Sequence, residues 1–93
     1  NELDSISRNI ITKAGYGPLF GHSLGHGVGL EVHEGATIGP GNNNIIRNNT
    51  IFSIEPGIYV ENLGGVRIED LVFVDDDNLI NFTDKFDKKM LVL

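Results

Sequence analysis

Two apolar segments of strand length, separated by only three residues, constrain the fold of this chain more than any other feature. Residues 51–60 and 64–74 are rich in Ile, Val, Phe and Tyr, and the short stretch Glu61-Asn62-Leu63 lies between them. Strand-forming runs with so short a connection predict an antiparallel β-hairpin. We expect Val60 to pair with Gly64 across the loop.

Each of these predicted strands carries one glutamate, Glu55 or Glu69, in an otherwise apolar pattern. The expected register places the two carboxylates opposite one another, where like charges destabilise a hairpin. A buried carboxylate is also unfavourable unless it is paired or bound to a cation, so one or two bridging metal ions would explain the arrangement. Pro56 has no N–H to donate, so the strand is expected to be bulged or frayed there. Arg67 shares the face of Glu69, and a simple surface ion pair between them remains an alternative.

All three histidines of the chain, His22, His26 and His33, fall in the glycine-rich segment GHSLGHGVGLEVHE, residues 21–34. The glycines disfavour a helix and let a ligand approach the backbone. In an extended strand His22 and His26 share a face, whereas His26 and His33 point to opposite faces. Either the backbone bends at Gly27 or Gly29, or His26 and His33 have separate roles.

The rest of the pattern predicts one helix, two loops and a last strand. Leu3, Ile6, Ile10 and Ala14 recur at helical spacing, and the helix is expected to end near Gly15. Residues 39–44 form a loop by composition, residues 75–78 a solvated turn, and residues 91–93 a short strand.

Composition narrows the class of protein. The chain has 93 residues, a formal net charge of −6 and no cysteine. It is therefore expected to be one small domain at most, and to bind neither nucleic acid nor a membrane, since both partners demand positive charge. Any metal must be held by His, Asp or Glu. No signal peptide or membrane-spanning stretch is visible, and a cytoplasmic location is expected.

The segments HSLGHGVGLEVHE, FSIEPGIYV and GGVRIED, in this order, carry a resemblance that covers nearly the whole chain. The sequence resembles the C-terminal half of a metallopeptidase of the pita-bread fold, the group that holds methionine aminopeptidases, aminopeptidase P and prolidases. The EPGIY and GVRIED forms are similar to the branch that cleaves Xaa-Pro bonds. The resemblance implies an α+β fold with the helix packed on an antiparallel sheet.

The same resemblance implies a site with two divalent metal ions, Mn or Co in the first place, with Zn or Fe as alternatives. It makes metal ligands of His26, Glu55 and Glu69, with Glu69 as the carboxylate that bridges the ions. Glu55 would also act as the proton shuttle. The expected substrate is a short peptide with proline in the second position, as for an Xaa-Pro dipeptidase or aminopeptidase.

Three further residues acquire roles from the resemblance. His22 and His33 would contact the substrate and stabilise the tetrahedral intermediate, and would not be ligands. Arg67 would orient the site or pair with a substrate carboxylate. Separate roles for His26 and His33 would also explain why a straight strand would point them to opposite faces.

One departure from the family pattern concerns two further aspartate ligands, which relatives carry in an earlier strand pair and which nothing here matches. Residues 1–93 are therefore expected to be the C-terminal part of a catalytic domain, inactive alone, with the missing N-terminal half as a partner and self-association as a homodimer. Two other functions stay open: a non-catalytic, protein-binding member of the same fold, and a methionine aminopeptidase. Another departure is Ala36, where many relatives carry proline.

Overall fold

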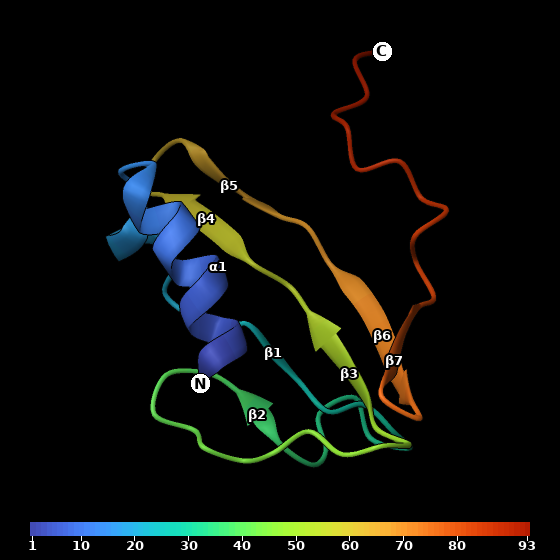
Figure 1. Cartoon of the computed structure of the whole chain (residues 1–93). Helices are drawn as coiled ribbons and strands as arrows, with labels where there is room; N and C mark the ends of the chain where they lie inside the picture. Colours follow the sequence, from blue (N-terminus) through green and yellow to red (C-terminus); the bar gives the residue numbers. More distant parts are fainter.

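The computed structural model describes residues 1–93 and shows one helix beside a set of antiparallel strands (Figure 1). The architecture is therefore α+β, as the sequence predicts. The elements in chain order are α1 (Glu2–Lys13), the 3-10 turn η1 (Gly17–Leu19), β1 (Gly25–His26), β2 (Thr37–Ile38), β3 (Ile51–Ile54), β4 (Gly57–Val60), β5 (Gly64–Arg67), β6 (Asp70–Asp75) and β7 (Asn78–Asn81).

Helix α1 ends where the sequence predicts. Ala14 caps it, and Gly15 follows with φ of +92°, a left-handed conformation that glycine adopts without strain. The apolar stripe nevertheless faces solvent, since Ile6 and Ile10 are 59% and 66% exposed. The buried position of the helix is instead Asp4, at 1% exposure. The inward face is thus organised around a charged residue.

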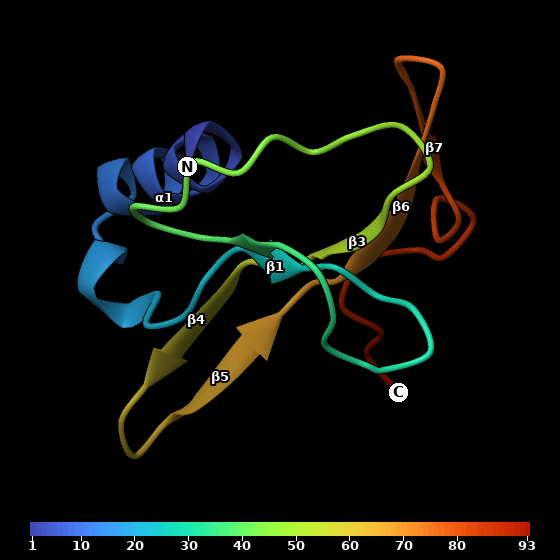
Figure 2. The same cartoon turned by 90° about the horizontal axis from the view of Figure 1, so that it is seen from below.

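The hairpin register is confirmed. In the β4–β5 ladder, Val60 pairs with Gly64 and Gly57 pairs with Arg67. The same register continues into the β3–β6 ladder, where Ile54 pairs with Asp70. Each predicted strand is therefore split in two. The breaks fall at residues 55–56, between β3 and β4, and at residues 68–69, between β5 and β6. Figure 2 shows the β4–β5 arm leaving the β3–β6 pair at an angle.

The C-terminal region differs from the prediction. The solvated turn is present, and Asp76 and Asp77 adopt positive φ values of 44° and 66°. It leads directly into β7, which pairs with β6 and was not predicted. The predicted strand at 91–93 is wrong, because these residues form no strand and are exposed. They lie at the end of an extended tail that leaves the fold (Figure 1).

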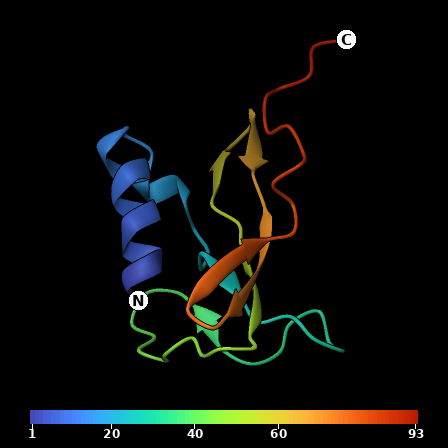
Figure 3. The same ribbon diagram turned by 45° about the vertical axis from the view of Figure 1, so that its right-hand side comes forward.

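A small core holds the strands and the histidine-rich segment together. Its buried side chains are Phe20, Leu24, Ile38, Phe52 and Val72. Two of them, Phe52 and Val72, face one another across the β3–β6 ladder. Figure 3 shows α1 standing beside the strands, joined to them through the segment that follows it. No helix has the length and apolar character required to cross a membrane.

Candidate functional site

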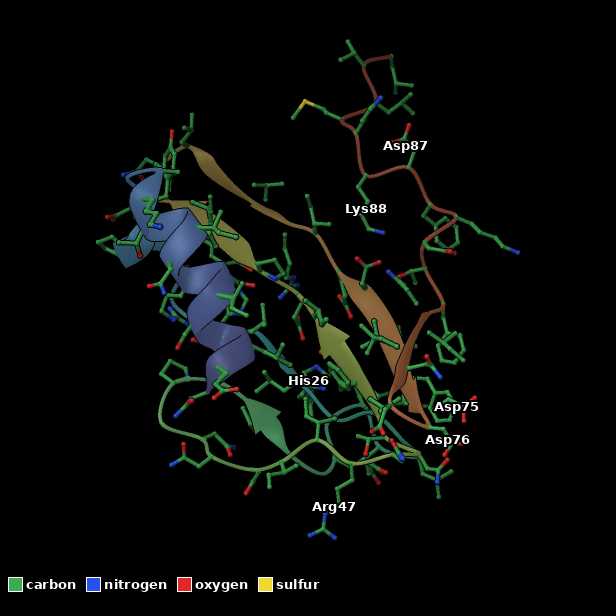
Figure 4. The ribbon with its side chains drawn as sticks, viewed as in Figure 1. His26, Arg47, Asp75, Asp76, Asp87 and Lys88 are labelled. Atoms are coloured by element: carbon green, nitrogen blue, oxygen red, sulfur yellow. The ribbon has the colours of Figure 1, made fainter.

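The site forms where the histidine-rich segment runs antiparallel to β3. Gly27 bridges Phe52, Val28 N–H donates to the Ile51 carbonyl at 3.0 Å, and Glu55 N–H donates to the Leu24 carbonyl at 2.7 Å. This pairing brings the first half of the chain to the break in the hairpin. His26 is thereby placed near the centre of the molecule (Figure 4).

Glycine makes this close approach possible. A Cβ atom built on Gly25 would lie 1.8 Å from the Ser53 carbonyl oxygen, and one on Gly27 would lie 2.1 Å from the Glu34 carbonyl oxygen. Both distances are far shorter than any side chain tolerates. The glycines that flank His26 are therefore required by packing, in addition to any access that they give to a ligand.

His26 and Glu55 meet at the centre of the site. His26 Nε2 lies 2.9 Å from Glu55 Oε1, and the side chains are 20% and 12% exposed. His26 Nδ1 lies 3.0 Å from the Gly27 carbonyl oxygen, which can only accept a hydrogen bond. With Nδ1 as the donor there, Nε2 faces an ionised carboxylate that also only accepts. A proton between Nε2 and Oε1, or a bound cation, would make this contact favourable. An imidazole nitrogen and a carboxylate oxygen are both metal ligands, so the pair fits a divalent metal ion.

Glu55 has two further neighbours. The Ser53 hydroxyl donates to Glu55 Oε1 at 2.8 Å, and Arg67 Nη1 lies 3.6 Å from Glu55 Oε2. Arg67 forms no ion pair with Glu69, so the alternative of a surface pair between those residues is wrong. The half-exposed guanidinium instead contributes positive charge at the Glu55 carboxylate.

Glu69 lies opposite Glu55 in the register but does not join the cluster. It is exposed, and the structure gives it no hydrogen bond or ion pair. No three His, Asp or Glu side chains of the chain lie close enough together to hold a metal ion. Of the two carboxylates that were expected to be buried, Glu55 is largely buried, with a side chain 12% exposed, and Glu69 is exposed. The reason is local: Glu69 occupies the break between β5 and β6, where Ile68 N–H bonds to the Pro56 carbonyl at 3.2 Å and no partner strand covers the side chain.

The structure shows the backbone bend that the sequence analysis gave as one explanation for the spacing of His26 and His33. The chain reverses after Gly27, whose N–H donates to the Ala36 carbonyl at 2.9 Å and whose carbonyl accepts from Glu34 N–H at 3.1 Å. The reversal brings the His33 ring to 4.1 Å from the His26 ring, centroid to centroid. The backbone therefore bends, and the two rings lie side by side. His33 remains exposed at the rim.

His22 lies apart from this pair and is fixed by a residue that the sequence analysis did not single out. Its Nδ1 is 2.8 Å from the Ser23 carbonyl and its Nε2 is 2.9 Å from the Tyr59 hydroxyl. The Ser23 carbonyl can only accept, so Nδ1 is the donor in that contact, while the Tyr59 hydroxyl can either donate to Nε2 or accept from it. Phe20 packs edge-on against the ring at 5.1 Å. Tyr59 belongs to the FSIEPGIYV segment, but nothing in its spacing predicts this contact.

An ion pair in α1 secures the segment that carries His22. Arg8 binds Asp4 through two nitrogens at 2.8 and 3.0 Å, and also donates to the Phe20 carbonyl at 2.7 Å and the His22 carbonyl at 2.9 Å. Asp4 accepts a further bond from Leu24 N–H at 3.1 Å. The hydrogen bond to Asp4 raises the pKa of the Arg8 guanidinium, so it is cationic at any physiological pH.

Comparison with known proteins agrees with these motifs. The sequence profile described as "metallopeptidase family M24" matches residues 1–76. An Xaa-Pro dipeptidase of Pyrococcus horikoshii is 55% identical over 73 residues, which are 78% of this chain and 21% of that protein. The structure of the Xaa-Pro dipeptidase from Bacillus anthracis has a TM-score of 0.92 at 40% identity, over 99% of this chain and 26% of that one. The X-Pro aminopeptidase from Thermotoga maritima has a TM-score of 0.90 at 44% identity, over 98% and 26%.

The chain thus spans between 21% and 26% of the length of these relatives. Within that span the backbone agrees closely with that of the solved pita-bread enzymes, which confirms the predicted fold class. The match to the family profile covers the helix, the histidine-rich segment and both glutamate-bearing strands. This chain belongs to the metallopeptidase family M24.

Proposed function

We propose that this chain serves a metal-dependent enzyme that hydrolyses the peptide bond before proline at the N-terminus of short peptides. The observation that carries the proposal is the 2.9 Å contact between His26 Nε2 and Glu55 Oε1, in the two motif segments of a family M24 chain. Relatives named Xaa-Pro dipeptidase share 55% and 48% of their matched residues with it.

In this proposal His26, Glu55 and Glu69 supply three of the ligands of a two-metal site. The hairpin register supports the set, because it puts Glu69 opposite Glu55. The other ligands, which the family resemblance implies are aspartates, would come from outside residues 1–93. When bound, the ions would provide a water of lowered pKa and polarise the scissile carbonyl. Imidazole and carboxylate ligands suit manganese or cobalt, and also zinc or iron.

The remaining side chains of the site have proposed roles in binding and proton transfer. The Glu55 carboxylate takes the proton of the attacking water and passes it to the leaving amine. The exposed His33 ring, beside His26, donates to the developing oxyanion. His22, with its ring held by Tyr59, contacts the substrate next to Gly57. Arg67 orients Glu55 or pairs with the substrate carboxylate.

We further propose that residues 1–93 are the C-terminal part of a larger catalytic domain, inactive alone. The share of its relatives that the chain covers supports this, as does the exposed apolar surface of the α1 stripe and the tail. Such surfaces favour association, so the missing half of the domain and a second copy in a homodimer are the expected partners.

A chimera tests the proposal directly. In the Bacillus anthracis Xaa-Pro dipeptidase, this chain would replace the matched quarter, where the backbones agree with a TM-score of 0.92. With Mn²⁺ we expect hydrolysis of Xaa-Pro dipeptides, lost in His26→Ala and Glu69→Gln and retained in Glu61→Gln, a loop control. A chimera that folds, as judged by circular dichroism, yet hydrolyses nothing would contradict the proposal.

The X-Pro aminopeptidase of Thermotoga maritima, 44% identical, makes longer Xaa-Pro peptides a second candidate substrate. The protein that contains this chain, assayed on Ala-Pro and on Ala-Pro-Ala, would separate the two activities. Cleavage of Met-Gly peptides instead would indicate a methionine aminopeptidase. Metal binding without hydrolysis of any of the three would indicate a non-catalytic member of the family.

A further inference from the structure

Ser53 is fully buried, with 0% of its surface exposed, and lies between the two side chains that define the centre of the site. Its Oγ accepts a hydrogen bond from His26 N–H at 3.1 Å and donates to Glu55 Oε1 at 2.8 Å. A hydroxyl has one proton, and the 2.8 Å contact to the carboxylate takes it in preference to the His26 carbonyl at 3.5 Å. One buried atom thus connects the backbone of His26 to the carboxylate of Glu55.

The backbone arrangement explains why a side chain makes this link. Glu55 N–H bonds to the Leu24 carbonyl, and Gly27 bridges Phe52, so His26 and Ser53 fall opposite one another between these pairs. The His26 N–H finds the Ser53 hydroxyl there instead of a main-chain carbonyl. A buried N–H without a partner is unfavourable by about 1–3 kcal/mol, so the hydroxyl cannot be removed without consequence at His26.

The link also restricts the Glu55 side chain. A glutamate has three rotatable bonds, and holding its carboxylate in one place requires contacts from more than one direction. The Ser53 hydroxyl and the His26 ring both contact Oε1, while the Arg67 guanidinium approaches Oε2. Of these three, only the serine is fixed by complete burial in a strand.

We propose that Ser53 is a positioning residue, which holds His26 and Glu55 in a geometry ready for a metal ion before any ion binds. The link itself stands on the structure, and its consequence for metal binding rests on the proposed function. Groups that orient metal ligands in this way commonly change metal affinity by about 10–100-fold when removed. Ser53 contacts the backbone N–H of His26 and not its ring, so its effect on this proposed ligand is one of orientation.

The first test uses amide hydrogen exchange, measured by NMR on the whole metal-free chain. In Ser53→Ala we expect exchange at the His26 amide to rise at least tenfold relative to the amides of Phe52 and Val72. Ser53→Thr keeps the hydroxyl and should restore protection at His26. Equal acceleration at all amides in Ser53→Ala, or no change at His26, would overturn the proposal.

Thr83→Ala provides a matched control. The Thr83 hydroxyl also accepts from a backbone N–H, that of Leu71 at 3.2 Å, and also donates to a carboxylate, that of Asp70, but it lies outside the site. Thr83→Ala should leave exchange at His26 unchanged. Acceleration at His26 equal to that in Ser53→Ala would show a general loss of stability and contradict a specific link.

Cobalt binding, measured by its visible absorption bands in the chimera described above, tests the consequence for the metal. We expect Ser53→Ala to raise the dissociation constant of Co²⁺ about 10–100-fold and Ser53→Thr to return it to within about threefold of the parent. Equal Co²⁺ affinity in all three proteins would overturn the positioning role. Absence of cobalt binding in every protein, with His26 exchange altered as expected, would refute the proposed metal function and leave the structural link intact.

Discussion

The ion pair between Asp4 and Arg8 offers the sharpest prediction about stability, because its contacts join the helix to the segment that carries His22. Asp4→Ala removes a carboxylate whose side chain is only 2% exposed. It deletes the two hydrogen bonds from Arg8 and the one from Leu24 N–H. Arg8 would keep its bonds to two main-chain carbonyls but would lose its only carboxylate.

The magnitude follows from burial. Breaking a buried ion pair by removing one partner is destabilising by about 3–5 kcal/mol, and Arg8 is 27% exposed, so water can solvate the remaining charge in part. The unpaired N–H of Leu24 adds about 1 kcal/mol or more, because this residue is in the core. We expect a loss of about 3 kcal/mol, which is a large part of the total stability of a domain this small.

Urea unfolding followed by circular dichroism measures this loss as a shift of the midpoint at constant slope. Glu2→Ala is the matched control, since Glu2 is an exposed acidic residue in the same first turn, and it should change stability by less than about 0.5 kcal/mol. The double variant Asp4→Leu with Arg8→Met should recover much of the loss, as apolar replacements of buried pairs often do. Asp4→Ala with the stability of the parent would refute the reasoning.

Three further predictions concern the strand segments and the tail. Gly25→Ala should destabilise the chain by more than about 2 kcal/mol in urea unfolding, because its Cβ would lie 1.8 Å from the Ser53 carbonyl oxygen; a smaller loss would contradict the close approach. Hydrogen bonds from Lys88 and then Thr83 lower the pKa of the Asp70 carboxyl, so its contribution to stability is present above about pH 4 and is lost as the pH falls through the lowered value. The difference between the unfolding midpoints at pH 6 and pH 3 should therefore be smaller in Lys88→Met than in the parent chain. An unchanged difference would contradict the role given to Lys88 in lowering the pKa of Asp70. Val72→Ala should lower the free energy of unfolding by about 2 kcal/mol at any pH, measured in the same assay. A loss below about 0.5 kcal/mol, as is usual for an exposed residue, would show that this position is not part of the core.

The sequence predicted those features whose determinants lie close together in the chain. The hairpin register followed from two β-rich runs and a three-residue loop, and Val60 does pair with Gly64. The end of the helix followed from Gly15, and the interruption of the strand from Pro56. In each case a single local constraint is enough: a short loop, a left-handed φ or a missing N–H.

Features that depend on distant contacts were not predicted. The periodicity of α1 indicates which helix positions are apolar, but not that Asp4 would be the buried one. The Asp4–Arg8 pair is local, but the Leu24 N–H that also donates to Asp4 lies twenty residues away. Lys88 lies in the C-terminal tail (Figure 4), and its Nζ is 2.6 Å from Asp70 Oδ1, a contact that no spacing rule predicts. Ser53 was visible inside a motif, yet its role emerges only when β3 lies against the histidine-rich segment.

The exposed Glu69 shows how far residues 1–93 determine the site. Residues held by pairings within the chain, such as Glu55 on Leu24 and His26 on Ser53, already lie in contact. Glu69 has the same register as Glu55 but lies in the break between ladders, and no neighbouring element constrains its carboxylate. In the proposed two-metal site, Glu69 would bridge the two cations, and those cations together with the other groups that hold them would fix the position of its carboxylate. If the proposed two-metal site is right, this chain alone already brings His26 and Glu55 together, whereas the position of Glu69 would depend on ligands from elsewhere.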